Sequence, residues 1–287
     1  MAANASSDHD PALCVWATVV LTAGQSVQIV LVLPLSLLVL CLGFQRWRRQ
    51  RTVPISHCDF FSYNLAIMEL IGVLGSVFSL SYTITHVPIS LTMGIVLGAF
   101  PWTGQMVFPI FTCVDRYLAV VHPITYMRLK HGGGRRIRQI SAALIWLMSF
   151  TSFGFVFFID KYPRLAYIPS ACQMPVFLII MTFCCVSTLC VLIGPRPGEG
   201  PRDRQRVDRS KQRACIIILM IMVVLCIRFG GTLFQNVIIS FATSPCRIYM
   251  IHTTLVWFNL PCSLVLPLLY LHRARTLQHR EHNTQSQ

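Results

Sequence analysis

Long apolar runs separated by short polar or charged segments dominate the pattern of this chain. Charges, prolines and glycines bound these runs at about residues 24–44, 58–84, 88–121, 138–159, 173–194, 213–241 and 249–271. A helix needs roughly 20 mostly apolar residues to cross the hydrocarbon core of a bilayer, so each run is long enough to do so. We therefore predict an all-α membrane protein, with a bundle of seven transmembrane helices in residues 24–271.

Two of the runs have unusual ends. As a single helix, the run at 88–121 would extend roughly 50 Å at 1.5 Å per residue, which exceeds the bilayer core and predicts that its end protrudes into the cytoplasm. After Tyr270, apolar and basic residues alternate between Leu271 and Arg280. This pattern predicts either a short amphipathic helix on the inner leaflet or a frayed basic tail.

Charged residues indicate which way the chain crosses the membrane. The composition is 54% hydrophobic and only 12% charged, with a net charge of +14. Most Lys and Arg residues fall at 46–51, 128–138, 196–213 and 273–280, which places them in every second loop. This is the positive-inside pattern. We expect residues 1–23 to be extracellular, residues 272–287 to form a cytoplasmic tail, and the basic charge to face membrane lipids rather than nucleic acid.

Three cysteines and one asparagine map to the predicted outer side. Most of the 12 cysteines lie inside apolar runs, whereas Cys14, Cys172 and Cys246 do not. Two of these three can pair under oxidising conditions, although the pairing cannot be read from sequence. Asn4 begins an Asn-Ala-Ser sequon. It is either a glycosylation site on the extracellular N-terminus or a chance match to a short pattern.

The most specific motif is Asp115-Arg116-Tyr117, followed by Leu-Ala-Val-Val-His-Pro, where the third apolar run meets the cytoplasm. It resembles the signature of the rhodopsin-like (class A) G-protein-coupled receptors. The resemblance implies that Asp115 holds Arg116 in the resting state and that an outward swing of the sixth helix frees it for a G protein. A guanidinium that exchanges partners at a membrane boundary is a reasonable two-state switch. The alternative is an ion pair that only marks the end of the helix.

Two further segments resemble the family with one substitution each. Asn64-Leu-Ala-Ile-Met-Glu69 has glutamate where the family has a sodium-binding aspartate, and the longer side chain changes the reach of such a site. A structural role for this buried carboxyl is equally open. Leu266-Pro267-Leu-Leu-Tyr270 lacks the usual asparagine. Pro267 can still loosen its helix, and we expect Tyr270 to meet Arg116 across the bundle.

Other positions depart further from the family. Leu91 stands where the resemblance implies the cysteine that anchors the second outer loop, so Cys172 loses its usual partner. A bridge between Cys14 and Cys246 is one possible substitute. We interpret Trp146, at the place of the fourth helix's tryptophan, as ordinary packing.

Arg228 lies midway along the sixth apolar run, where a charged side chain costs at least roughly 2.5 kcal/mol unless it is paired or hydrated. It can anchor an anionic ligand, line a water-filled cavity or form an internal ion pair with Glu69; the ion pair is the slightly favoured interpretation. Further polar residues in the outer half of the runs are candidates either for a ligand pocket or for bonds between helices: Tyr82, His86, Gln105, Gln235, Asn236, His252 and Asn259.

These patterns favour a receptor that passes a small-molecule or lipid signal across the plasma membrane to a heterotrimeric G protein. No nucleophile elbow, metal-protease motif or P-loop is present, so we expect neither enzyme activity nor a cofactor or metal. Two alternatives stay open. One is a receptor fold that no longer signals. The other is a transporter that uses Glu69 and Arg228, although the chain lacks matching interrupted helices in two halves.

Overall fold

The computed structural model describes residues 11–49, 57–131, 134–159, 163–193, 201–241 and 245–285, and the regular elements in these ranges are all helices. This confirms the all-α prediction. In chain order the helices are α1 (Pro11–Arg49), α2 (His57–Thr85), α3 (Pro88–Ala99), α4 (Trp102–Val121), α5 (Pro123–His131), α6 (Gly134–Ile159), α7 (Pro163–Ile193), α8 (Pro201–Phe241) and α9 (Pro245–Gln285).

Six segments within the described ranges are long and apolar enough to cross a membrane: Ala12–Arg48, Asp59–Thr85, Pro88–Val121, Cys172–Ile193, Cys215–Phe241 and Cys246–His272. Large apolar side chains cover their outward surfaces; Val30, Ile179 and Phe234, for example, are 69%, 68% and 63% exposed. A surface this apolar fits a lipid environment. The chain is therefore a multi-pass membrane protein. The predicted fourth span is α6, which is not one of the six segments, so a seventh crossing stays a prediction.

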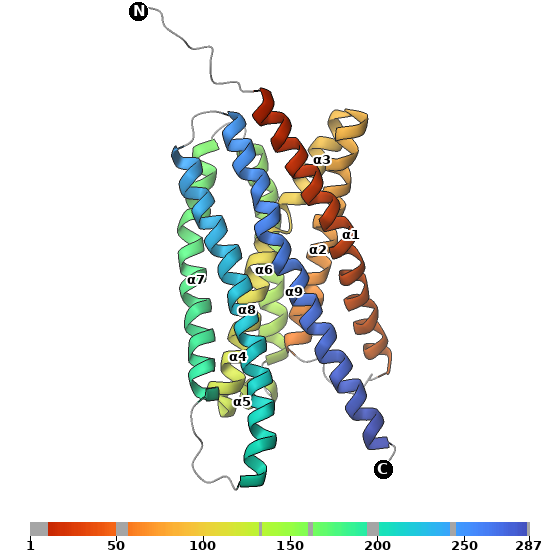
Figure 1. The fold of residues 1–287 in the computed structure, drawn as a ribbon, viewed down its shortest axis with the longest axis vertical. Coiled ribbons are helices and arrows are strands. Elements are labelled where there is room, and N and C mark those ends of the chain that lie inside the picture. Colours follow the sequence, from red (N-terminus) through yellow and green to blue (C-terminus); the bar gives the residue numbers. More distant parts are fainter. Residues whose placement is uncertain are drawn as a thin grey trace, which may run out of the picture.

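Neighbouring helices close into a ring around α4. α1 contacts both α2 and α9, α8 lies between α7 and α9, and α6 contacts α7. α4 contacts α2, α6 and α7 together. α1 starts at one end of the bundle and α9 finishes at the other (Figure 1). The buried core runs through the middle of this ring, where Met68, Phe108, Met181 and Leu225 are almost inaccessible to solvent.

The third apolar run differs from its prediction because it is not one helix. α3 ends with a hydrogen bond from the Phe100 amide to the Val96 carbonyl, and α4 begins with a bond from the Gln105 amide to the Pro101 carbonyl. Pro101 has no amide hydrogen, so the helix cannot continue through it with normal bonding. This break makes Trp102, rather than Pro88, the first residue of the helix that carries Arg116.

Two other helix ends and one additional helix also differ from the predictions. α1 begins at Pro11, so the predicted boundary at residue 23 lies inside a helix; residues 11–23 contain neither a charge nor a glycine that would stop it. α9 runs without interruption to Gln285, and the separate helix after the seventh run is therefore wrong. No glycine or proline lies between Tyr270 and Gln285 to break it. α5, with Pro123 at its first position, was not predicted.

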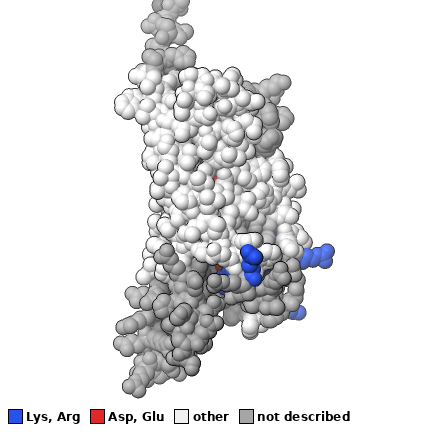
Figure 2. Space-filling model, turned by 90° about the vertical axis from the view of Figure 1, so that its right-hand side faces the viewer, with Lys and Arg blue, Asp and Glu red and all other residues white. Residues whose placement is uncertain are grey.

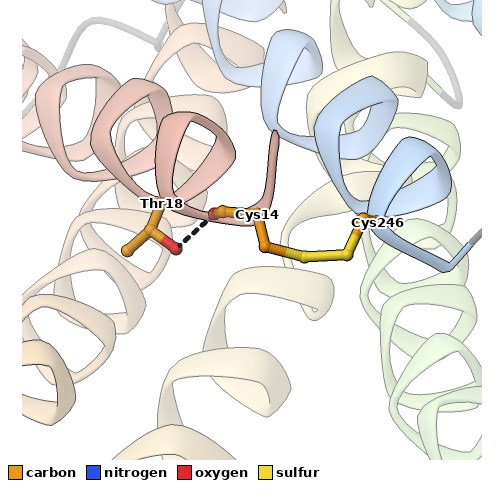
Figure 3. Close-up of a disulfide and its surroundings, with 3 residues drawn as sticks. All are labelled: Cys14, Thr18 and Cys246. Atoms are coloured by element: carbon orange, nitrogen blue, oxygen red, sulfur yellow. Dashed lines mark hydrogen bonds between the residues drawn. A yellow bond between two sulfur atoms is a disulfide. The ribbon is translucent and has the colours of Figure 1, made fainter. Parts of the chain in front are cut away.

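A disulfide fastens the first turn of α1 to the first turn of α9. It joins Cys14 to Cys246 across 232 residues of sequence, and the Thr18 hydroxyl donates a hydrogen bond to the Cys14 carbonyl at 3.0 Å (Figure 3). Cys172 is exposed and free. Of the pairings that the sequence left open, the structure contains this one. Asn4, the candidate glycosylation site, lies outside the described residues.

Candidate functional site

Glu69 on α2 lies at the centre of the bundle and is only 1% exposed. Each of its carboxylate oxygens accepts one hydrogen bond. Gln105 Nε2 on α4 donates to Oε2 at 3.1 Å, and Ser263 Oγ on α9 donates to Oε1 at 2.9 Å. A buried carboxyl is costly without such partners. Glu69 therefore ties α2 to both α4 and α9.

Arg228 on α8 joins the same group of side chains through Gln105. Its side chain is fully buried, and Nη2 donates a hydrogen bond to Gln105 Oε1 at 3.2 Å. The Gln105 amide thus accepts a bond from Arg228 and donates one to Glu69, because an amide has both an acceptor and donors. This bridge takes the place of the direct ion pair expected between Glu69 and Arg228, which the described residues do not form. Nε and Nη1 of Arg228 have no hydrogen-bond partner among the described residues.

Arg116 lies in the last turns of α4 and faces α7 and α8. It lines a cavity of about 10 Å³ together with Cys185 and Thr188 of α7 and with Ile218 and Ile221 of α8. Such a space holds about one water molecule. The described Lys and Arg side chains in Figure 2 also gather toward one end of the molecule, while the middle of the visible face is almost entirely white, with one small acidic spot.

Tyr117, next to Arg116, points toward α7. Its ring packs against Phe183 with 5.8 Å between centroids, and its hydroxyl lies 3.3 Å from His122 Nε2. On α9, Pro267 is buried and the Tyr270 hydroxyl lies 2.8 Å from the hydroxyl of Tyr63 on α2. The expected approach of Tyr270 to Arg116 stays a prediction.

Trp146 does more than the packing role predicted for it. Its indole N–H on α6 donates a hydrogen bond to Asn64 Oδ1 on α2 at 3.0 Å, and the Asn64 amide nitrogen donates to the Phe60 carbonyl at 2.9 Å. The sequence contained both residues, but nothing in the pattern indicated that they face each other. This bond fixes α6 to α2 within the apolar interior.

A cavity of about 370 Å³ lies between α1, α2, α3, α4 and α9. Among the seven predicted pocket residues, Gln105, His252 and Asn259 line it. The other four do not. Tyr82 and His86 stack on each other with ring centroids 6.1 Å apart, Gln235 Nε2 donates to the Ile251 carbonyl at 2.6 Å, and Asn236 lies on α8, which contributes no residue to this cavity.

Several polar residues of this cavity were not predicted from the sequence. Gln25 and Gln28 of α1 line it and bond to α2: Gln25 Nε2 donates to Ser79 Oγ at 2.9 Å, and Ser76 Oγ donates to Gln28 Oε1 at 3.3 Å. Their spacing of three residues places both on one face of α1. That spacing was the available signal, but the predicted run began at residue 24 and its polar positions were given no role.

Neither the family models nor the curated proteins that were searched contain a match to this chain. The fold and its apolar surface define a multi-helix, multi-pass membrane protein. The helices enclose a group of buried polar side chains on α2, α4, α8 and α9, and Arg116 lies near one end of α4. Among the described residues, no group of three or more His, Cys, Asp or Glu side chains is placed to hold a metal ion.

Proposed function

We propose that this chain is a rhodopsin-like G-protein-coupled receptor in the plasma membrane, with seven crossings and an extracellular N-terminus. It would transmit a small-molecule or lipid signal to a heterotrimeric G protein. The observation that carries the proposal is the position of Arg116. It follows Asp115 at one end of a central helix and faces α7 and α8 across a space of one water molecule.

The contacts around Arg116 support a switch with a closed state. Ile218 and Ile221 of α8 cover the same small cavity as Arg116, so an outward movement of α8 would widen it. An exposed guanidinium favours a partner with unpaired carbonyl oxygens, and the C-terminus of a helix offers such oxygens together with a negative dipole end. A helical segment of a G protein that enters from the basic end of the bundle would supply both the carbonyl oxygens and the negative end of the helix dipole.

The buried polar group supports a connection between this end and the rest of the bundle. Gln105 lies on the same helix as Arg116 and binds Arg228 on α8, the helix that would move. A change at Gln105 would therefore alter how α8 is held against α4. The same bond restrains the closed arrangement when no signal is present.

Nucleotide exchange on purified G proteins tests the proposal. The wild-type chain in lipid nanodiscs is compared with Arg116→Ala across a panel of G proteins and a broad ligand library. Arg48→Ala is the matched control, because Arg48 is an exposed arginine at the end of α1. We expect exchange with wild type and Arg48→Ala, and a loss of at least about 10-fold for Arg116→Ala, corresponding to about 1.4 kcal/mol of lost interaction.

Two outcomes would overturn this assignment. Exchange that is absent with every G protein and ligand would reduce the chain to a receptor fold that does not signal. Solute or ion flux through proteoliposomes without any exchange would favour a transporter, with the buried Glu69 and Arg228 in its pathway.

A further inference from the structure

The cavity of about 370 Å³ stays open because glycines of α2 and α3 form part of its wall. Gly75 and Gly98 both line the cavity, and a Cβ added to Gly75 would lie only 2.6 Å from the Gly98 backbone nitrogen. The two backbones thus approach each other closely here, and neither glycine has a side chain that would project into the space. Its volume falls within the range of about 300–1,000 Å³ that is usual for small-molecule sites.

Two buried oxygen atoms, on the neighbouring helices α1 and α9, lack hydrogen-bond donors. Oε1 of Gln25 on α1 and Oδ1 of Asn259 on α9 have no partner among the described residues, and the Gln25 side chain is only 8% exposed. Gln25 Nε2 is already bound to Ser79, which leaves the oxygen as the unsatisfied end of the amide. Unpaired buried acceptors are costly. Both oxygens are inaccessible to solvent but belong to side chains that line the cavity, so an occupant that donates hydrogen bonds would satisfy them once the two amide groups turn toward it.

The remaining lining residues exclude a charged occupant. Among the described residues that line the cavity there is no Asp, Glu, Lys or Arg, and His252 is the single titratable side chain. Glu69 lies behind the wall, and its two oxygens are occupied by Gln105 and Ser263, which line the cavity themselves. A buried ion needs a counter-charge or strong hydrogen bonds. Leu255, Val256 and Leu260 offer apolar contact instead.

We infer that this cavity binds a small, uncharged molecule that donates hydrogen bonds to Gln25 and Asn259 and packs its apolar part against α9. A molecule bound in the cavity would affect α8 through Gln105, because Gln105 both lines the cavity and accepts the hydrogen bond from Arg228. The transmission step rests on the proposed receptor function, whereas the binding step does not. Of the seven pocket residues predicted from the sequence, only Gln105, His252 and Asn259 line this cavity.

Photolabelling in nanodiscs tests the binding step. The probe is an uncharged alkanol carrying a diazirine, compared with a carboxylate and an ammonium on the same skeleton. We expect saturable labelling by the alkanol of peptides that contain Gln25, Ser76 and Asn259, competed by excess unlabelled alkanol. Asn259→Leu on α9 and Gln25→Leu on α1 should each weaken saturable labelling by about 10-fold, the effect of losing one hydrogen bond. Gln139→Leu, the same change at an exposed position on α6, should leave it unchanged.

The outcomes separate this inference from the proposed function. Labelling that does not saturate, that is equal for the charged analogues, or that is unaffected in both cavity variants would overturn the site. Nucleotide exchange without saturable labelling would keep the receptor proposal and remove the site. Saturable labelling without any nucleotide exchange would establish the site and remove the receptor proposal, together with the transmission step.

Discussion

Glu69 and Arg228 are held one side chain apart, joined by the two ends of the Gln105 amide at 3.1 and 3.2 Å. If the two groups interact through this amide, their energetic coupling should depend on it. A double-mutant cycle of Glu69→Gln and Arg228→Met, measured by unfolding of the purified protein, should give a coupling of about 0.5–3 kcal/mol. In a Gln105→Leu background we expect that coupling to fall by more than half.

The same double-mutant cycle distinguishes coupling through the Gln105 amide from direct electrostatic coupling between Glu69 and Arg228. Gln139→Leu serves as the control background, because it removes an exposed amide far from this group in sequence and on another helix. Coupling that is equally large in the Gln105→Leu and control backgrounds would mean that the two charges act on each other without the amide.

The Cys14–Cys246 disulfide should stabilise the fold through the ends of α1 and α9. Cys14→Ser or Cys246→Ser should each reduce the free energy of unfolding by about 2–4 kcal/mol, and the double variant should lose no more than either single one. Cys172→Ser, which removes an exposed free thiol, should change nothing. Thermal unfolding with and without a reducing agent measures this. A melting temperature of wild type that does not respond to reduction would contradict the pairing.

The bond between Trp146 and Asn64 should contribute to stability beyond the packing of the ring. Trp146→Phe keeps an aromatic side chain but leaves Asn64 Oδ1 without its donor, so we expect a loss of about 1–3 kcal/mol. Trp16→Phe makes the same change at a position that is 63% exposed on α1. Its melting temperature should match wild type. Equal melting temperatures for the two variants would show that the indole N–H contributes nothing.

The sequence predicted the helical runs well because apolar length is a strong signal in a bilayer. It failed at Pro101, where a proline inside an apolar run broke the helix, and at the tail, where nothing in the chain stops α9. The site was harder to predict. Glu69 and Arg228 were recognised because charges are rare in apolar runs, but a glutamine such as Gln105 is common, and its two bonds depend on how α2, α4 and α8 pack. Side-chain periodicity does not contain that information.

In the proposed receptor, α8 closes over Arg116 and moves away when a G protein binds. Nitroxide labels at Met127→Cys and Ile216→Cys, both exposed and on α5 and α8, report this movement by double electron–electron resonance. The exposed native cysteines Cys41, Cys172 and Cys190 are changed to serine first.

A reference pair at Met127→Cys and Ile137→Cys spans α5 and α6 and leaves α8 out. With a nucleotide-free G protein bound, we expect the distance from 127 to 216 to lengthen by several ångströms and to return on addition of a GTP analogue. The reference pair should not change. A distance from 127 to 216 that stays the same in a complex shown to contain the bound G protein would contradict it.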